Sequence, residues 1–176
     1  MEKSLKSNAL NFGLYLGVIL AAINIIVYVI DIKLYSSLWV AAVSIVTIIT
    51  LGTISCNSSK KLLGGFMSFK EAFTSYFITV AVGLFISTII YFVLFNFVDP
   101  ESAQVLAEMQ IDGQVEMMEN FGAPQESIDE AVAKMKENNP FSIGNQILGY
   151  AIFLTIMSLI GLIVAAITKR KDPNVA

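Results

Sequence analysis

The sequence predicts an all-α membrane protein with four transmembrane helices and an amphipathic helical extracytoplasmic insertion between helices 3 and 4. Of its 176 residues, 56% are hydrophobic and only 14% are charged, and the mean hydropathy is +0.72. A soluble domain of this size needs a polar exterior that this composition cannot supply. Four stretches also lack Asp, Glu, Lys and Arg altogether, namely residues 7–30, 34–59, 72–98 and 138–168. A helix of roughly 20 apolar residues crosses a bilayer, so each stretch is long enough to span it.

The first stretch predicts a retained helix and not a cleaved signal peptide. Lys3 and Lys6 precede it as they would in a signal peptide. Its apolar segment, however, is longer than the about 7–15 residues of a signal sequence, and it lacks a convincing cleavage site. We therefore expect one membrane domain over residues 1–176, with spans at about 9–30, 34–56, 72–97 and 142–168.

Small residues recur at helical spacing inside three of the predicted spans. Such ridges let helix backbones approach closely, so that van der Waals contact drives their association. We interpret them as packing surfaces within one four-helix bundle. Homodimerisation through the first span and a glycine-lined permeation path are the alternatives. The candidate helix-packing residues are Gly13, Gly17, Ala21, Gly83 and Gly161.

The segment before the third span has the pattern of a helix start. Ser68 and Glu71 have the spacing of a capping box, in which Ser68 is the N-cap and Glu71 bonds back to its N–H. The glycine pair at 64–65 permits a sharp turn out of the basic loop. Phe69 and Phe73 share a helical stripe suited to the membrane interface. We interpret the segment as the start of a membrane helix, with a partner-docking surface or a catalytic site as the alternatives.

Residues 99–140 form an acidic loop that carries ten acidic and two basic residues, a net charge of −8. Residues typical of helix starts and ends predict two or three short amphipathic helices over the outer end of the bundle. Asp99 followed by proline marks an N-cap, Gly113 a break, Gly122 a helix end and Ser127 a second capping box. The carboxylates are interpreted as solvated surface, with a basic partner, electrostatic tuning or a cation site at Asp112, Glu116 and Glu119 as alternatives.

Basic residues predict the orientation, because positive charge in short loops stays on the cytoplasmic side. The two termini and the loop before the third span hold eight lysines and arginines, and the opposite side holds three. We therefore expect a bacterial inner-membrane location with the N- and C-termini both in the cytoplasm.

The residue inventory argues against an enzyme. The chain has one cysteine, Cys56, and no histidine, which excludes a Cys/His metal site and catalysis by a nucleophile paired with histidine. The negative charge excludes nucleic acid. We expect no catalytic, cofactor-binding or metal-binding residues and no cofactor. The expected partners are the lipid bilayer and either another copy of the chain or other membrane proteins.

Two hypotheses about function follow. The first is a non-enzymatic envelope protein with a structural or interaction role, which rests on the packing ridges and the structured acidic loop. The alternative is a small transporter or channel subunit that acts as an oligomer, with a polar path through the spans. The residues that would line this path are Asn24, Asn96, Asn145 and Gln146.

Four stretches together carry a family resemblance. They are FGLYLG at 12–17, GFMSFKEAF at 65–73, FGAP at 121–124 and IGLIVAA at 160–166 before a basic tail. The chain resembles the family of small four-span bacterial membrane proteins catalogued as a domain of unknown function, numbered four thousand one hundred and ninety-nine. The resemblance covers roughly residues 5–172. It implies a cell-membrane location and assigns no activity or site.

Overall fold

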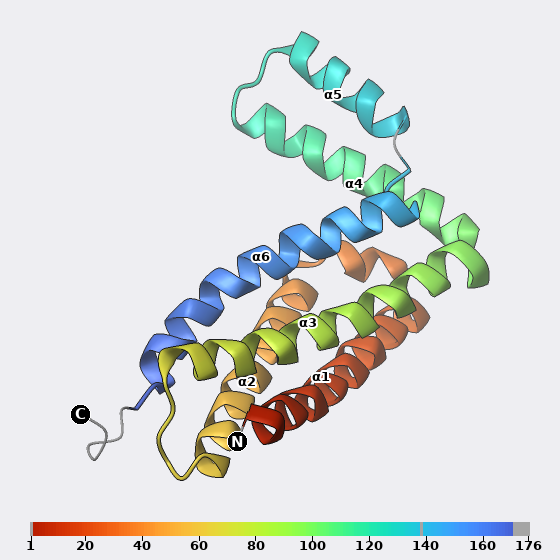
Figure 1. Cartoon of the computed structure of the whole chain (residues 1–176). Helices are drawn as coiled ribbons and strands as arrows, with labels where there is room; N and C mark the ends of the chain where they lie inside the picture. The colour runs from red at the N-terminus through yellow and green to blue at the C-terminus, as the bar shows by residue number, and fades with distance from the viewer. Residues whose placement is uncertain (1, 138, 171–176) are drawn as a thin grey trace.

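The structure, a computed structural model, describes residues 2–137 and 139–170. Helices make up 89% of it, and the described residues contain no β-strand. Within them, six α-helices are joined by short connections, with a 3-10 helix after the first and a π-helical turn after the third (Figure 1). The bounds are α1 Glu2–Ile30, η1 Ile32–Ser36, α2 Leu38–Leu62, α3 Phe69–Val93, η2 Leu94–Val98, α4 Pro100–Asn120, α5 Gln125–Glu137 and α6 Ile143–Thr168.

Four of these helices are long and apolar enough to cross a membrane, which confirms the predicted all-α fold with four such helices. They are α1, α2, α3 with its π-helical extension, and α6, and their apolar segments are 25 to 30 residues long. The start of the second differs from the expectation, because α2 begins at Leu38 and not at residue 34. The Asp31 carboxylate accepts a hydrogen bond from the Lys33 N–H and starts the 3-10 helix there.

Helix α3 is the central helix of the bundle, because it has the most extensive contacts with both α1 and α6 and also contacts α2 (Figure 1). The glycines of α1 and α3 each face a larger side chain of the other helix. Cβ atoms added to Gly13 and Gly17 would lie 2.7 and 2.6 Å from side chains of α3, and one added to Gly83 would lie 2.5 Å from Leu16. Ala21 is partly buried. The glycine ridge of α1 is therefore filled by α3 of the same chain.

Tyr76 of α3 fills the space between α2 and α6 at a point where both helices carry a glycine. Its ring is fully buried, and a Cβ atom added to either Gly52 or Gly161 would lie 2.5 Å from it. Its hydroxyl has no hydrogen-bond partner among the described residues. Gly161 thus makes room for an aromatic ring, and not for the close approach of another helix backbone.

A network of buried hydroxyl groups joins α2 and α3 near the end of the bundle that holds the termini. The Ser75 Oγ lies 3.1 Å from the Ser55 Oγ and 2.8 Å from the Ser59 Oγ. Thr79 donates to Ser55 at 2.7 Å, and the Asn8 amide of α1 donates to Ser59 at 3.0 Å. Because lipid cannot satisfy polar groups, these bonds help to hold the three helices together.

Helices α4 and α5 form a hairpin that projects from the opposite end of the bundle (Figure 1). The predicted break at Gly113 is wrong, because α4 continues through it, and one glycine inside a helix costs only about 1 kcal/mol relative to alanine. Gly122, with φ +73°, follows the end of α4. The second predicted capping box is also wrong. Helix α5 begins at Gln125, so Ser127 lies inside the helix, where its N–H donates to the Pro124 carbonyl.

A second hydrophobic cluster fixes the base of the hairpin to the bundle. Phe95 of η2 and Leu106 of α4 are each 1% exposed, and Phe141 packs with them. The Phe95 ring centroid lies 4.7 Å from that of Tyr91 and 5.5 Å from that of Tyr35. The cluster therefore joins α3, the 3-10 helix, the first turns of α4 and the residues just before α6.

Candidate functional site

A cavity lined by uncharged polar and apolar side chains lies among α1, α2, α3 and α6, in the half of the bundle nearer the hairpin. Its volume is about 550 Å³. A smaller hollow of about 270 Å³ adjoins it beneath α4 and shares five of its lining residues. We call the two together the polar cavity. Its larger part is lined by Leu20, Asn24, Tyr35, Ser44, Ile48, Leu84, Ser87, Thr88, Tyr91, Gln146 and Phe153.

Two amide side chains from opposite sides of the bundle contribute to this lining. The Asn24 Nδ2 of α1 donates to the Ser87 Oγ of α3 at 3.0 Å, and the Tyr35 hydroxyl donates to the Asn24 backbone carbonyl at 2.7 Å. Gln146 lies in the first turn of α6, and its Nε2 donates to the Pro140 carbonyl at 3.3 Å. Both amides are thus oriented by neighbouring groups.

The structure brings together three of the four amides predicted to line a polar path. Asn24 and Gln146 line the larger part of the polar cavity, and Asn145 lines the smaller part. Asn96 lies apart, in a separate hollow under α4. Its Nδ2 donates to the Phe92 and Phe141 carbonyls at 3.0 and 3.1 Å. Asn96 therefore ties the π-helical turn to the segment before α6.

The polar cavity ends inside the bundle. Ile48 and Leu84 line its inner end. Val80 and Tyr76 lie about one and two turns before Leu84 on α3, toward the end that holds the termini. Both of these side chains are almost fully buried, and the hydroxyl network lies on the same side. Packed side chains thus separate the cavity from the end of the bundle that holds the termini.

The polar cavity offers both hydrogen-bonding groups and apolar surface to a ligand. Its lining offers amide and hydroxyl groups beside leucine, isoleucine and aromatic side chains. This mixture suits a small neutral molecule or the upper part of a lipid, with hydrogen bonds at one end and apolar contact along its length. Nowhere in the described ranges do three His, Cys, Asp or Glu side chains come together as a metal site, and this includes the acidic residues of α4.

The capping residues before α3 lie at the other end of the bundle. The Ser68 N–H donates to the Glu71 carboxylate at 2.8 Å, and the Glu71 N–H donates to the Ser68 Oγ at 3.3 Å, which makes a capping box. Phe69 is 40% exposed, and the Lys169 Nζ lies 6.0 Å from its ring centroid. Phe73 is partly buried and stacks on Phe77.

A contact that the sequence does not reveal ties this segment to the end of α6. Met67 and Arg170 exchange two backbone hydrogen bonds of 2.9 and 2.8 Å. The guanidinium of Arg170 also lies 5.7 Å from the Phe66 ring centroid. The partners are about 100 residues apart in the chain, and no local pattern marks such a pair. These contacts give the segment a structural role in closing the bundle.

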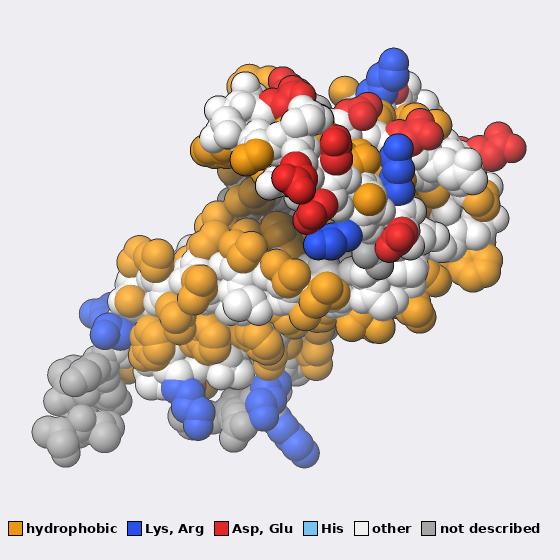
Figure 2. Space-filling view, turned by 90° about the horizontal axis from the view of Figure 1, so that it is seen from above, with side chains coloured by type: hydrophobic (Ala, Val, Ile, Leu, Met, Phe, Trp, Pro, Cys, Tyr) orange, Lys and Arg blue, Asp and Glu red, His pale blue; other side chains and the backbone are white. Residues whose placement is uncertain are grey.

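The two ends of the molecule differ in the charge of their side chains. Carboxylate side chains gather over α4 and α5, while lysine and arginine side chains mark the far end of the bundle (Figure 2). Asp99 holds the hairpin at its first residue, where its carboxylate accepts from the Ser102 hydroxyl at 2.6 Å, from the Ser102 N–H at 3.0 Å and from the Tyr28 hydroxyl at 3.0 Å. The Ser102 hydroxyl and N–H lower the pKa of Asp99 below its ordinary value.

Replacing Asp99 with alanine is expected to loosen the hairpin, because α4 loses its N-cap and Tyr28 loses an acceptor. Because the pKa of Asp99 is lowered, the stabilisation that its cap provides depends on pH. The ionised cap stabilises the hairpin above the unfolded-state pKa near 3.8, and this stabilisation is lost as the pH falls through the lower folded-state pKa.

The fluorescence anisotropy of a dye on Ser127→Cys measures the motion of the hairpin across this pH range. Asp99→Asn, which keeps the capping oxygen, should stay rigid without the acid transition. Equal anisotropy for Asp99→Ala and the unaltered chain would contradict the expectation.

Comparison with known families adds one result. A family model described as "Protein of unknown function (DUF4199)" matches residues 11–170. No curated protein and no solved structure matches the chain significantly. The matched range takes in α1 from residue 11 onward, the other three long helices, the hairpin and the capping segment with its contacts to Lys169 and Arg170.

Proposed function

The chain belongs to the DUF4199 family of proteins of unknown function, and we propose that it is a multi-pass protein of the bacterial inner membrane with both termini in the cytoplasm. The four long apolar helices support the membrane location. The orientation is supported by the basic residues near the termini and before α3, including Lys60, Lys61 and Lys70, because such residues stay on the cytoplasmic side.

This orientation places the hairpin outside the cytoplasm, which a single cysteine tests. Ser127 is exposed on α5, and the native Cys56 is fully buried. We expect Ser127→Cys to react with a membrane-impermeant maleimide in intact cells, while the unaltered chain stays unlabelled. Labelling that requires disruption of the membrane would reverse the proposed orientation.

The activity that we propose is a non-enzymatic structural or interaction role, carried by the acidic hairpin. The observation that supports it is the way the hairpin is held. The Asp99 cap and the Phe95–Leu106–Phe141 cluster fix its base, while the carboxylates of α4 and α5 stay exposed. A rigid element with a net charge of −8 over residues 99–140 presents a surface suited to a basic partner.

The polar cavity favours a second candidate, a transporter subunit or small-molecule binding protein. Asn24 and Gln146 approach one space of about 550 Å³ from different helices, as a binding site would require. The packed side chains around Tyr76 close this space on one side, so transport would need a rearrangement of the bundle. A passive channel through one chain is therefore the weaker version of this candidate.

Two variants tested in cells that lack the protein distinguish the candidates. The first neutralises the outer face of α4, with Glu108, Glu116 and Glu119 changed to Gln and Asp112 to Asn. The second changes Asn24 and Gln146 to Leu in the polar cavity. Membrane abundance is measured for both, and growth and envelope integrity are compared with those of cells that carry the unaltered chain.

We expect the hairpin variant to behave like the empty strain and the cavity variant to behave like the unaltered chain. Photo-crosslinking from position 112 should then give a protein adduct that does not form when irradiation is carried out in high salt, while a probe at the exposed Val43 of α2 should give no such adduct. The reverse result, with function lost only in the cavity variant, would favour the second candidate and would contradict the interaction role of the acidic face.

A further inference from the structure

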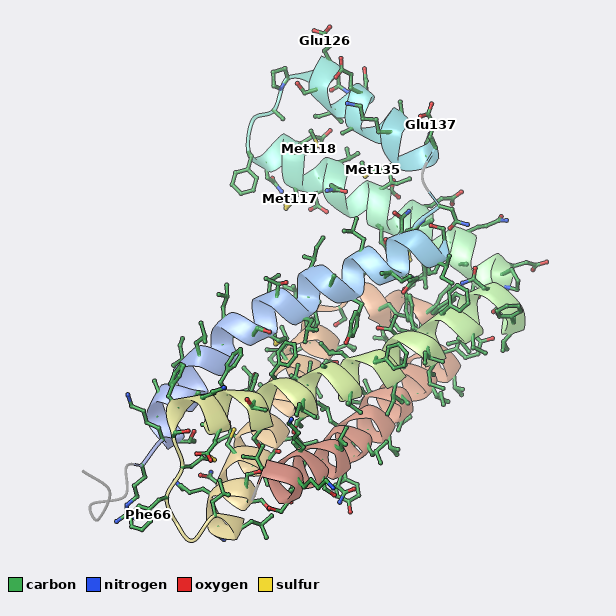
Figure 3. The ribbon with its side chains drawn as sticks, viewed as in Figure 1. Phe66, Met117, Met118, Glu126, Met135 and Glu137 are labelled. Atoms are coloured by element: carbon green, nitrogen blue, oxygen red, sulfur yellow. The ribbon has the colours of Figure 1, made fainter. Side chains whose placement is uncertain are left out.

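One face of α4 is buried at its start and exposed beyond the bundle. Ala103 and Leu106 are 7% and 1% exposed, whereas Met117 and Phe121 are 51% and 85% exposed. These residues share one side of the helix. At 3.6 residues per turn, roughly five turns separate Ala103 from Phe121 and roughly three separate Leu106 from Met117. In Figure 3, Met117 projects from the side of α4 that faces α6, whereas Met118 lies toward α5.

The opposite side of α4 carries its carboxylates. Glu108 and Glu119 are each two positions from a residue of the apolar face, Leu106 and Phe121, which turns them by roughly 200°. Asp112 lies nine positions, or about two and a half turns, from Ala103, so it points to the same side as Glu108 and Glu119. All three are exposed. Helix α4 thus has an uncharged side toward the bundle, on which Gln110 and Gln114 lie between the apolar residues, and a charged side away from it. This division continues past the last bundle contact.

No described part of the bundle covers the apolar side of α4 beyond its first turns. Its backbone lies close to η1, η2 and α5, and the side chains of its first turns also pack against Tyr91 and Phe141. The exposed apolar surface of the bundle reaches the start of α4. Phe97 and Val98, just before α4, are 72% and 62% exposed, and Ile143 at the start of α6 is 66% exposed. In a bilayer these side chains face lipid, and lipid also fills the space beside them.

We infer that the α4–α5 hairpin rests on the outer surface of the bilayer, with Met117 and Phe121 inserted among the lipid headgroups and upper acyl chains. The inference rests on the proposed membrane location and adds a lipid contact to it. Amphipathic helices of this kind bury their apolar side about 5–10 Å into the interface. The carboxylates of α4 then point into water, away from any anionic headgroups. The lipid fixes how far the acidic face stands from the membrane.

Nitroxide accessibility tests the inference in the full chain. The chain, with Cys56→Ser, is placed in vesicles of phosphatidylethanolamine and phosphatidylglycerol. A spin label is attached to Phe121→Cys or, as the matched control on the opposite side, to Glu119→Cys. A third label at Ile152→Cys reports the lipid-facing surface of α6, where the native side chain is 54% exposed. Collision with oxygen, which concentrates in lipid, is compared with collision with a water-soluble nickel chelate.

We expect the oxygen-to-nickel ratio at position 121 to approach that at position 152 and to exceed that at position 119 clearly. A water-like ratio at 121 beside a lipid-like ratio at 152 would overturn the lipid contact and leave the membrane location intact. A water-like ratio at 152 would overturn the membrane location itself. Protection of 121 from both reagents, or spin–spin broadening that dilution with unlabelled chain removes, would mean that protein covers this face and would also reject the inference.

Discussion

Gly161→Ala is expected to destabilise the bundle by about 1–3 kcal/mol, although alanine forms helices better than glycine. The new Cβ would lie 2.5 Å from the Tyr76 ring. The ring cannot move away freely, because Gly52 of α2 lies against its other side at the same distance from an added Cβ. The free energy of unfolding, measured by titrating the detergent-solubilised chain with a denaturing detergent, should fall accordingly.

Gly149→Ala provides the control within the same helix. An added Cβ at Gly149 has no atom within 4 Å, so the alanine meets open space. Its better helix propensity should stabilise the chain by up to about 1 kcal/mol. The opposite signs of the two alanine substitutions are the test. If both variants are equally stable, the Tyr76 ring does not occupy the position between α2 and α6 that the structure gives it.

The membrane helices could be predicted because their signal is local. A stretch without charge, such as residues 72–98, needs no information from the rest of the chain. The capping box of Ser68 and Glu71 is local too, since both partners lie within one helical turn. The small-residue spacing of Gly13 and Gly17 marks a packing surface in the same way, but the spacing does not say which helix fills it.

The rest of the structure depends on contacts between distant residues. Gly161 has a spacing partner in Ala165, yet its neighbour in space is Tyr76, which no periodic pattern pairs with it. The polar cavity is lined by residues of α1, α2, α3 and α6, so it depends on how these helices pack against one another and not on the sequence of any one of them. Gly113 shows the opposite error, in which a local signal predicts a break at a position where α4 is continuous.

Leu106→Ala is expected to lower the free energy that holds the hairpin to the bundle by about 2–5 kcal/mol, the cost of deleting a buried leucine side chain. Leu106 is 1% exposed in the cluster with Phe95 and Phe141. The loss should be local, because this cluster is separate from the one around Tyr76. Hydrogen exchange in lipid nanodiscs should therefore speed up at the amides of α4 and α5 and stay unchanged in the part of α3 around Tyr76.

Val105→Ala is the matched control, because Val105 is the neighbouring residue and is 42% exposed. We expect its effect to stay within about 0.5 kcal/mol. The contrast separates the contribution of the buried contact from any general effect of alanine in α4. If Leu106→Ala also accelerates exchange in the part of α3 around Tyr76, the hairpin and the bundle unfold as one unit. The acidic face would then be stabilised by the whole bundle, and the hairpin could not move independently when it binds a partner.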